Sequence, residues 1–137
     1  MGSTERMRLL LDTHILLWSL LDPSQLSKRV AHELEDPSNE LWLSPISTWE
    51  ILLLAEKGRI ILDDDPATWL RGVLREIPFK EAVLTHEIAI QSRTLDLPQN
   101  DPADRFLAAT SIVYGLTSVT ADKRLMIARN FSVLSNE

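Results

Sequence analysis

Short apolar segments alternate with longer helical segments along the whole chain. The apolar segments have the length and composition of buried β-strands, and we expect them at residues 7–11, 41–44, 82–84, 117–119 and 132–134. The segments between them are predicted to be helices, at residues 13–21, 24–35, 47–57, 66–75, 86–93, 101–114 and 121–129. Strands joined through a helix pair in parallel, because a parallel connection needs a long crossover. The alternation therefore predicts an α/β fold with helices on both faces of a parallel sheet.

The length of 137 residues is sufficient for one domain with a substantial core. We expect that domain to cover residues 7–137, and residues 1–6 to be a disordered or vector-derived extension. The hydrophobic share of 45% and the charged share of 25% are ordinary for a soluble globular protein. No run approaches the roughly 20 apolar residues that span a bilayer, so we expect no association with a membrane.

Cysteine is absent from the sequence. This excludes a disulfide framework, a thiolate metal site and a cysteine nucleophile, and it fits a reducing compartment, so we expect a cytoplasmic protein. The net charge of −6 argues against a protein that binds nucleic acid through its overall charge. It does not argue against a nuclease whose acidic residues gather in one pocket and are neutralised there by a metal ion.

Four acidic residues lie where predicted strands lead into helices: Asp12, Glu50, Asp104 and Asp122. Asp12 directly follows the first strand, and Asp122 opens the helix after the fourth. Glu50 and Asp104 are expected in the first turns of their helices. In open parallel sheets, ligands bind outside the carboxyl ends of the strands. The four carboxylates are therefore the first candidates for chemistry.

Taken singly, each of these acids is better explained as part of a helix start. Ser47-Thr-Trp-Glu50 fits a capping box, in which Ser47 begins the helix and Glu50 bonds back to it. Asp101-Pro-Ala-Asp104 fits an N-cap, a first-turn proline and an acid at the third position. The other two acids suit the positive end of a helix dipole.

Taken together, the four acids favour a metal site. Serine, threonine or asparagine can cap a helix equally well, so capping alone does not require a carboxylate at every junction. Four carboxylates at one edge of a sheet repel one another unless a cation lies among them. Oxygen ligands without cysteine suit Mg²⁺ or Mn²⁺, and such an ion can activate water for attack on a phosphodiester.

Four segments of the chain contain these acids: Leu10-Leu-Asp-Thr-His14, Ser44-Pro-Ile-Ser-Thr-Trp-Glu50, Asp101-Pro-Ala-Asp-Arg-Phe-Leu-Ala-Ala-Thr110 and Val119-Thr-Ala-Asp122. In order, they resemble the motifs of the PIN-domain family, most closely its bacterial VapC-type toxins. This resemblance implies a three-layer α/β/α sandwich with a five-stranded parallel sheet in the order 3-2-1-4-5. It also implies a metal-dependent endoribonuclease that cuts RNA, acts as the toxin of a toxin–antitoxin pair and is inhibited by a cognate antitoxin protein.

Matched residue by residue, the resemblance assigns catalytic roles to the same four acids. Asp12, Glu50 and Asp104 correspond to the family's three central acids, and Asp122 corresponds to a more variable fourth. The resemblance implies that Asp12 and Asp104 are the direct ligands of a Mg²⁺ or Mn²⁺ cofactor.

Other polar residues near the acids have two interpretations. Thr13 and Thr120 could orient a ligand or water, or could cap a helix. Asp101 is close enough to join the acids, but an N-cap role is favoured. The run at residues 63–65, three aspartates, is expected to be a solvated loop rather than a metal cluster.

The four tryptophans are many for this length, and we expect most of them in the core. With the resemblance, their number favours a homodimer whose surface lies on the early helices and includes Trp18 and Trp49. Three basic residues close to the acids in sequence could contact RNA phosphates, although solvated or ion-paired positions explain each of them singly: Arg105, Lys123 and Arg124.

Two other enzyme and signalling classes place an aspartate after the first strand. A phosphotransferase of the haloacid dehalogenase type needs a second aspartate two residues later, where this chain has His14. A receiver-like phosphoacceptor module needs an aspartate after the third strand, and Leu84-Thr85 offers none. A non-catalytic PIN-like or receiver-like module that binds metal without cutting RNA stays open as an alternative.

Overall fold

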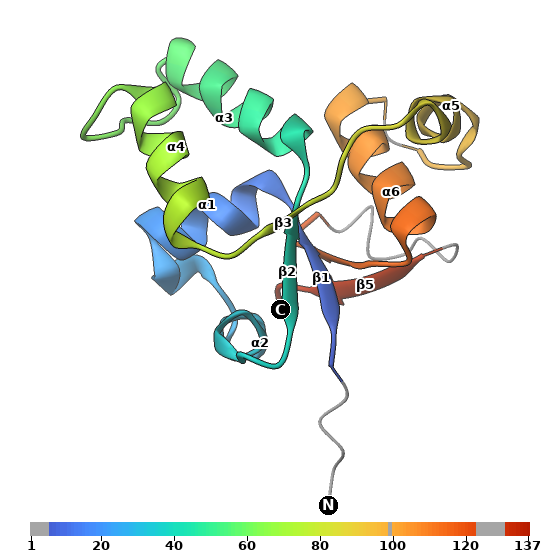
Figure 1. The fold of residues 1–137 in the computed structure, drawn as a ribbon, viewed down its shortest axis with the longest axis horizontal. Coiled ribbons are helices and arrows are strands. Elements are labelled where there is room, and N and C mark those ends of the chain that lie inside the picture. The colour runs from blue at the N-terminus through green and yellow to red at the C-terminus, as the bar shows by residue number, and fades with distance from the viewer. Residues whose placement is uncertain (1–5, 99, 123–130) are drawn as a thin grey trace, which may run out of the picture.

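The computed structural model describes residues 6–98, 100–122 and 131–137. Its strands form one five-stranded parallel sheet in the order β3-β2-β1-β4-β5, which confirms the predicted order. Helices α1 to α4 cover one face of this sheet and α5 and α6 cover the other (Figure 1). The strands are β1 (Arg8–Leu11), β2 (Glu40–Leu43), β3 (Lys80–Glu81), β4 (Thr117–Thr120) and β5 (Ser132–Ser135). The helices are α1 (Thr13–Leu21), α2 (Lys28–Glu35), α3 (Pro45–Glu56), α4 (Pro66–Glu76), α5 (His86–Thr94) and α6 (Pro102–Tyr114).

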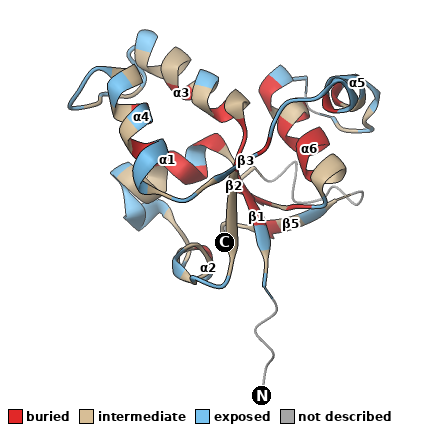
Figure 2. Cartoon of the chain, viewed as in Figure 1, coloured by how far each residue is buried: buried red, intermediate tan, exposed pale blue. Residues whose placement is uncertain are grey.

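The central strand β1 contributes leucine side chains to a hydrophobic core on each side of the sheet. Leu9 and Leu11 pack into the cluster beneath α1 to α4, whereas Leu10 packs with Leu107 of α6 on the other face. Successive side chains of a strand point to opposite faces, so an uninterrupted leucine run is what a strand buried on both sides requires. Figure 2 shows the buried parts of α1, α3 and α6 turned towards the sheet.

Local signals in the sequence set the limits of α6. Asp101 is its N-cap, and Pro102 occupies the first turn, where the missing N–H of proline costs no hydrogen bond. The helix ends at Gly115, whose backbone is left-handed with φ of 65°. Glycine adopts this conformation without strain, and the predicted end of this helix at residue 114 is confirmed.

Two predicted elements are placed differently by the structure. The third strand is Lys80–Glu81 rather than residues 82–84, because Lys80 and Glu81 are the residues in register with β2. The Ala82 amide adds one hydrogen bond to the Leu43 carbonyl, and the apolar Val83 and Leu84 are exposed. A charged two-residue strand is suited to the edge of a sheet, where it discourages pairing with another chain. The helix predicted at 24–35 is a 3₁₀ turn, Pro23–Gln25, followed by α2, because Ser27 starts a new helix as its N-cap.

The apolar run at residues 60–62 forms no strand, and the aspartates that follow lie in an exposed loop as predicted. Asp65 ends this loop as the N-cap of α4, accepting a hydrogen bond from the Thr68 amide. Most of the helix predicted at 121–129 lies outside the described residues. No helix in the described ranges is both long and apolar enough to cross a membrane.

Candidate active site

Asp12 directly follows β1, at the carboxyl end of this strand. Its backbone amide donates to the Val119 carbonyl at 3.1 Å, which extends the pairing of β1 with β4 by one residue. Its carboxylate accepts hydrogen bonds from the His14 amide at 3.1 Å and from the Thr120 hydroxyl at 2.8 Å. Asp12 is therefore the N-cap of α1, as the capping interpretation expected, and is also fixed to the end of β4.

The predicted capping box at Ser47 and Glu50 is wrong. The helix begins two residues earlier, at Pro45, and Ser44 is its N-cap, accepting a hydrogen bond from the Ile46 amide at 3.0 Å. Ser47 is buried inside the helix, and Glu50 lies in the second turn. The Glu50 carboxylate instead accepts a hydrogen bond from the Thr13 hydroxyl. Pro45 explains the difference, because proline is favoured in the first turn of a helix.

Asp101 and Asp104 divide the roles at the start of α6. The Asp101 carboxylate accepts from the amides of Ala103 at 2.9 Å and of Asp104 at 3.4 Å, which confirms the predicted N-cap. Asp104 lies in the first turn, as predicted, and its side chain is partly buried. Asp101 is thus the N-cap of α6. Helix capping therefore does not explain why position 104 has a carboxylate.

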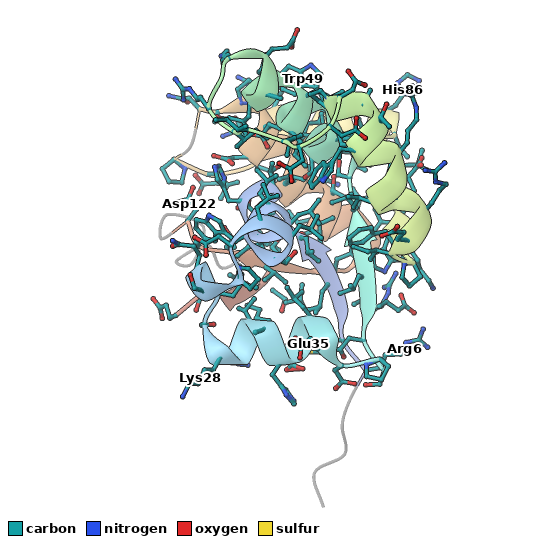
Figure 3. All side chains as sticks on the ribbon, turned by 90° about the vertical axis from the view of Figure 1, so that its left-hand side faces the viewer. Arg6, Lys28, Glu35, Trp49, His86 and Asp122 are labelled. Carbon is teal, nitrogen blue, oxygen red and sulfur yellow. The ribbon has the colours of Figure 1, made fainter. Side chains whose placement is uncertain are left out.

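Asp122, labelled in Figure 3, follows β4 and is joined to Asp12 through Thr120. The Asp122 amide donates to the Thr120 hydroxyl oxygen at 3.0 Å, and that hydroxyl donates its own proton to Asp12. Thr120 itself is fully buried. One hydroxyl therefore fixes the relative positions of two strand-end acids.

The acids lie close enough together to change one another's ionisation. The pKa of Asp104 is raised to about 7, first by burial and then by the negative charges of Asp101, Asp12, Asp122 and Glu50. Burial also raises the pKa of Glu50, with Asp12 and Asp101 adding to the effect and the Thr13 hydrogen bond opposing it. Like charges disfavour ionisation, so all four predicted acids, together with Asp101, belong to one electrostatic cluster.

Burial is also the main cause that raises the pKa of Asp12. The hydrogen bonds from Thr120 and His14 act in the opposite direction, and the charge of Asp122 adds to the increase. A carboxylate that is desolvated and surrounded by other acids favours a cation in its neighbourhood.

The donor set fits a hard divalent cation. Asp12, Glu50, Asp104 and Asp122 offer only carboxylate oxygens, the ligands that Mg²⁺ and Mn²⁺ prefer. Among the described residues, no three of these carboxylates bring oxygens within 4.8 Å of one another. Mg²⁺ usually keeps several waters and binds directly to one or two carboxylates, so this wider spacing suits a hydrated ion.

The comparison with known proteins agrees with this architecture. The PIN domain family matches residues 9–130. The chain belongs to the PIN domain family. The ribonuclease VapC22 of Mycobacterium tuberculosis (strain ATCC 25618 / H37Rv) is 34% identical to it over 124 residues, covering 88% of this chain and 92% of the relative. The predicted membership, drawn from the four motifs, is confirmed.

Solved structures share the fold of this PIN domain. One is VapBC2 from Rickettsia felis bound to a DNA fragment from its promoter, with a TM-score of 0.71 and 16% identity. Another is a toxin–antitoxin complex from Klebsiella pneumoniae, with a TM-score of 0.70 and 20% identity. Each comparison covers 94% of this chain and 98% of the other chain.

The charge cluster of the PIN domain predicts that removing the charge of Asp104 stabilises the metal-free protein. The folded-state pKa of Asp104 lies above its ordinary value of 3.8, so the folded protein holds this proton more tightly than the unfolded chain does. The resulting stability is complete below pH 3.8 and is lost as the pH rises to about 7. At about pH 8, Asp104→Asn should raise the free energy of unfolding by about 1–2 kcal/mol, a value reduced for partial exposure.

Urea unfolding of both proteins in chelator, between about pH 5 and about pH 8, measures this difference. It should shrink towards the lower pH, where the native carboxyl becomes protonated. A variant less stable than the wild type at the higher pH would show that Asp104 serves mainly the helix dipole.

Arg105 does not have the role that its neighbourhood in sequence suggested. Its side chain is buried and donates to the carbonyls of Ser92 at 2.6 Å, Leu95 at 2.7 Å and Leu97 at 3.1 Å. Within the described residues, the guanidinium thus bonds to backbone carbonyls instead of facing solvent. The suggested contact with RNA phosphate is therefore wrong. Lys123 and Arg124, the other two candidates, lie outside the described residues.

The tryptophans are less buried than expected. Trp18, Trp42 and Trp69 are only partly buried and pack at the margins of the two cores. Trp49 is 54% exposed, and in Figure 3 it lies at the end of the molecule opposite to Lys28 and Glu35. The large rings contribute edges to the core while the leucines fill its centre.

Proposed function

We propose that this PIN domain protein is a metal-dependent endoribonuclease and the toxin of a toxin–antitoxin pair. The observation that carries the proposal is the cluster of acids at the carboxyl edge of the sheet, in which Asp104 has a pKa of about 7. Strongly perturbed carboxyls that gather at one place in a fold are candidates for a functional site. The relative VapC22 is named as a ribonuclease, which supports the choice of RNA as substrate.

In this proposal Asp12 and Asp104 hold a Mg²⁺ or Mn²⁺ ion. When bound, such an ion supplies an activated water and positive charge that offsets the negative charge developing on a phosphodiester. Asp12 is well suited to its part because two hydrogen bonds fix its carboxylate at the end of β1. Glu50 and Asp122 complete the acidic cluster, and burial raises the pKa of Glu50, a shift that is common for carboxyls in acid–base catalysis.

Incubation of the purified protein with RNA tests the proposal. We expect internal cleavage with Mn²⁺ or Mg²⁺ and none with excess chelator. Cleavage that persists in chelator would refute the metal mechanism. Mn²⁺ binding without any cleavage would favour the alternative, a non-catalytic binding module.

The proposed antitoxin partner inserts a basic side chain among the carboxylates. The cluster is negatively charged in a protein of net charge −6, and an arginine can bridge two carboxylates through parallel hydrogen bonds. Solved VapBC and toxin–antitoxin assemblies share the fold, which supports a protein partner for this chain. A structure of the complex with no antitoxin cation near Asp12 or Asp104 would count against this proposal.

We also propose a homodimer. Trp49 is a large aromatic side chain that is 54% exposed, and aromatic residues are enriched in the cores of such interfaces. Light scattering of the wild type at high concentration should give the mass of two chains. Trp49→Ser should shift that mass towards one chain if the surface lies there, and an unchanged dimer would place the surface elsewhere.

A further inference from the structure

Two buried hydroxyl groups form a hydrogen-bonded chain that ends on the Glu50 carboxylate. The Thr13 hydroxyl oxygen lies 3.0 Å from that of Ser47 and is hydrogen-bonded to Oε1 of Glu50. We infer that Thr13 is a positioning residue, which holds Glu50 in the acidic cluster through this hydrogen bond. The inference rests on the proposed function, because it assigns Thr13 a part in the same site.

The direction of the chain follows from counting protons. An ionised carboxylate only accepts hydrogen bonds, so Thr13 must donate its single hydroxyl proton to Glu50. The Thr13 oxygen can then only accept from Ser47, which donates its own proton. Thr13 and Ser47 both have an exposed fraction of 0%, so solvent water cannot take the place of either partner.

The position of Thr13 explains why Glu50 needs such a partner. Glu50 has a long side chain, and the negative charges of Asp12 and Asp101 act on it. Without a donor, repulsion would turn this side chain away from the cluster towards solvent. Thr13 directly follows Asp12 and begins α1, whereas Glu50 belongs to α3. A single hydroxyl therefore fixes one acid relative to another from a different element, as a preorganised site requires.

Thr13→Val tests the inference, since valine keeps the shape of threonine and removes the hydroxyl. We expect kcat for Mn²⁺-dependent RNA cleavage to fall by about 10-fold to 100-fold, because small displacements of catalytic groups have effects of this size. KM should change little, since Glu50 acts on the reaction rather than on binding of the RNA. Thr13→Ser retains a hydroxyl and should recover most of the lost rate.

A double-mutant cycle with Glu50→Gln separates positioning from general damage. If Thr13 acts through Glu50, Thr13→Val should have almost no further effect on kcat in the Glu50→Gln background. Ser47→Ala should cause a smaller loss than Thr13→Val, because Thr13 can still donate to Glu50. An undiminished rate in Thr13→Val, or an equal loss with and without Glu50, would overturn the inference. If Thr13→Val does not fold, Thr13→Ser decides, because it keeps the hydroxyl and should keep most of the rate. A loss of kcat of about 10-fold or more in Thr13→Ser would then overturn the inference.

A second readout keeps this test separate from that of the proposed function. Mn²⁺ affinity, measured by calorimetry, should weaken in Thr13→Val, and Thr13→Val should weaken it no further in the Glu50→Gln background. A wild type that binds Mn²⁺ but cuts no RNA would refute the nuclease proposal. The inference about Thr13 would then be decided on Mn²⁺ affinity alone, where equal binding by Thr13→Val and wild type overturns it.

Discussion

Asp104→Asn is expected to lower the rate of Mn²⁺-dependent RNA cleavage by about 1,000-fold, the scale of losing a group that stabilises the transition state directly. The substitution keeps the shape of the side chain and its place in the first turn of α6. It removes the charge of Asp104, the proposed metal ligand whose pKa is raised in part by four neighbouring carboxylates. Single-turnover cleavage of one defined RNA by both proteins measures the effect.

The same residue predicts how metal binding depends on pH. A proton and a metal ion compete for the Asp104 carboxylate, and the metal-free pKa is about 7. Mn²⁺ affinity should therefore weaken as the pH falls from about 8 to about 5, and Asp104→Asn should abolish most of this dependence. Calorimetric titrations of both proteins across that range provide the measurement.

Asp101→Asn is the matched control for Asp104→Asn. It makes the same chemical change on the same helix, three residues earlier, and asparagine caps a helix as well as aspartate does. We expect it to keep the rate within about 10-fold of the wild type, since Asp101 is held by the amides of Ala103 and Asp104. Equal losses in the two variants would show that overall negative charge, rather than a ligand at Asp104, supports cleavage.

The sheet was predictable because its signals are local and strong. The leucines of β1 form an apolar run that only a strand buried on both faces explains, and Gly115 marks the end of α6 through a backbone angle that favours glycine. The strand order itself came from the resemblance to a known family, since periodicity does not specify which strands are neighbours. The limits of β3 were wrong because pairing with β2, rather than hydrophobicity, selects Lys80 and Glu81.

The site was predictable as a set of acids but not as a set of contacts. Acids at strand ends reach one edge of a parallel sheet by topology alone. The partner of Glu50 was not predictable, because Ser47 and Glu50 match the pattern of a capping box and the competing start at Pro45 lies two residues earlier. Thr13 was expected either to orient a ligand or water or to cap a helix, and its bond to Glu50 was not foreseen. Its bond to Glu50 joins residues 37 positions apart, and no local pattern encodes such a contact.

Arg105→Met is expected to lower the free energy of unfolding by about 3 kcal/mol, which is large beside the usual effect of one substitution. The Arg105 guanidinium, only 7% exposed as a residue, donates to three carbonyls at the end of α5 and in the segment that follows. Methionine fills part of the same volume but donates nothing, so buried carbonyls lose their partners. Urea unfolding at neutral pH, in chelator, gives the value.

Arg93→Met, at the exposed end of α5, is the control for this loss. It removes the same charge from the same region and should change stability by no more than about 0.5 kcal/mol, because Arg93 is exposed. Arg105→Lys should fall between the two, since an ammonium group cannot reach three carbonyls in the fixed geometry of a guanidinium. A small effect of Arg105→Met would mean that water replaces the guanidinium at these carbonyls. The Asp101 cap and the packing of α5 on α6 would then hold the segment before α6, and with it the position of Asp104.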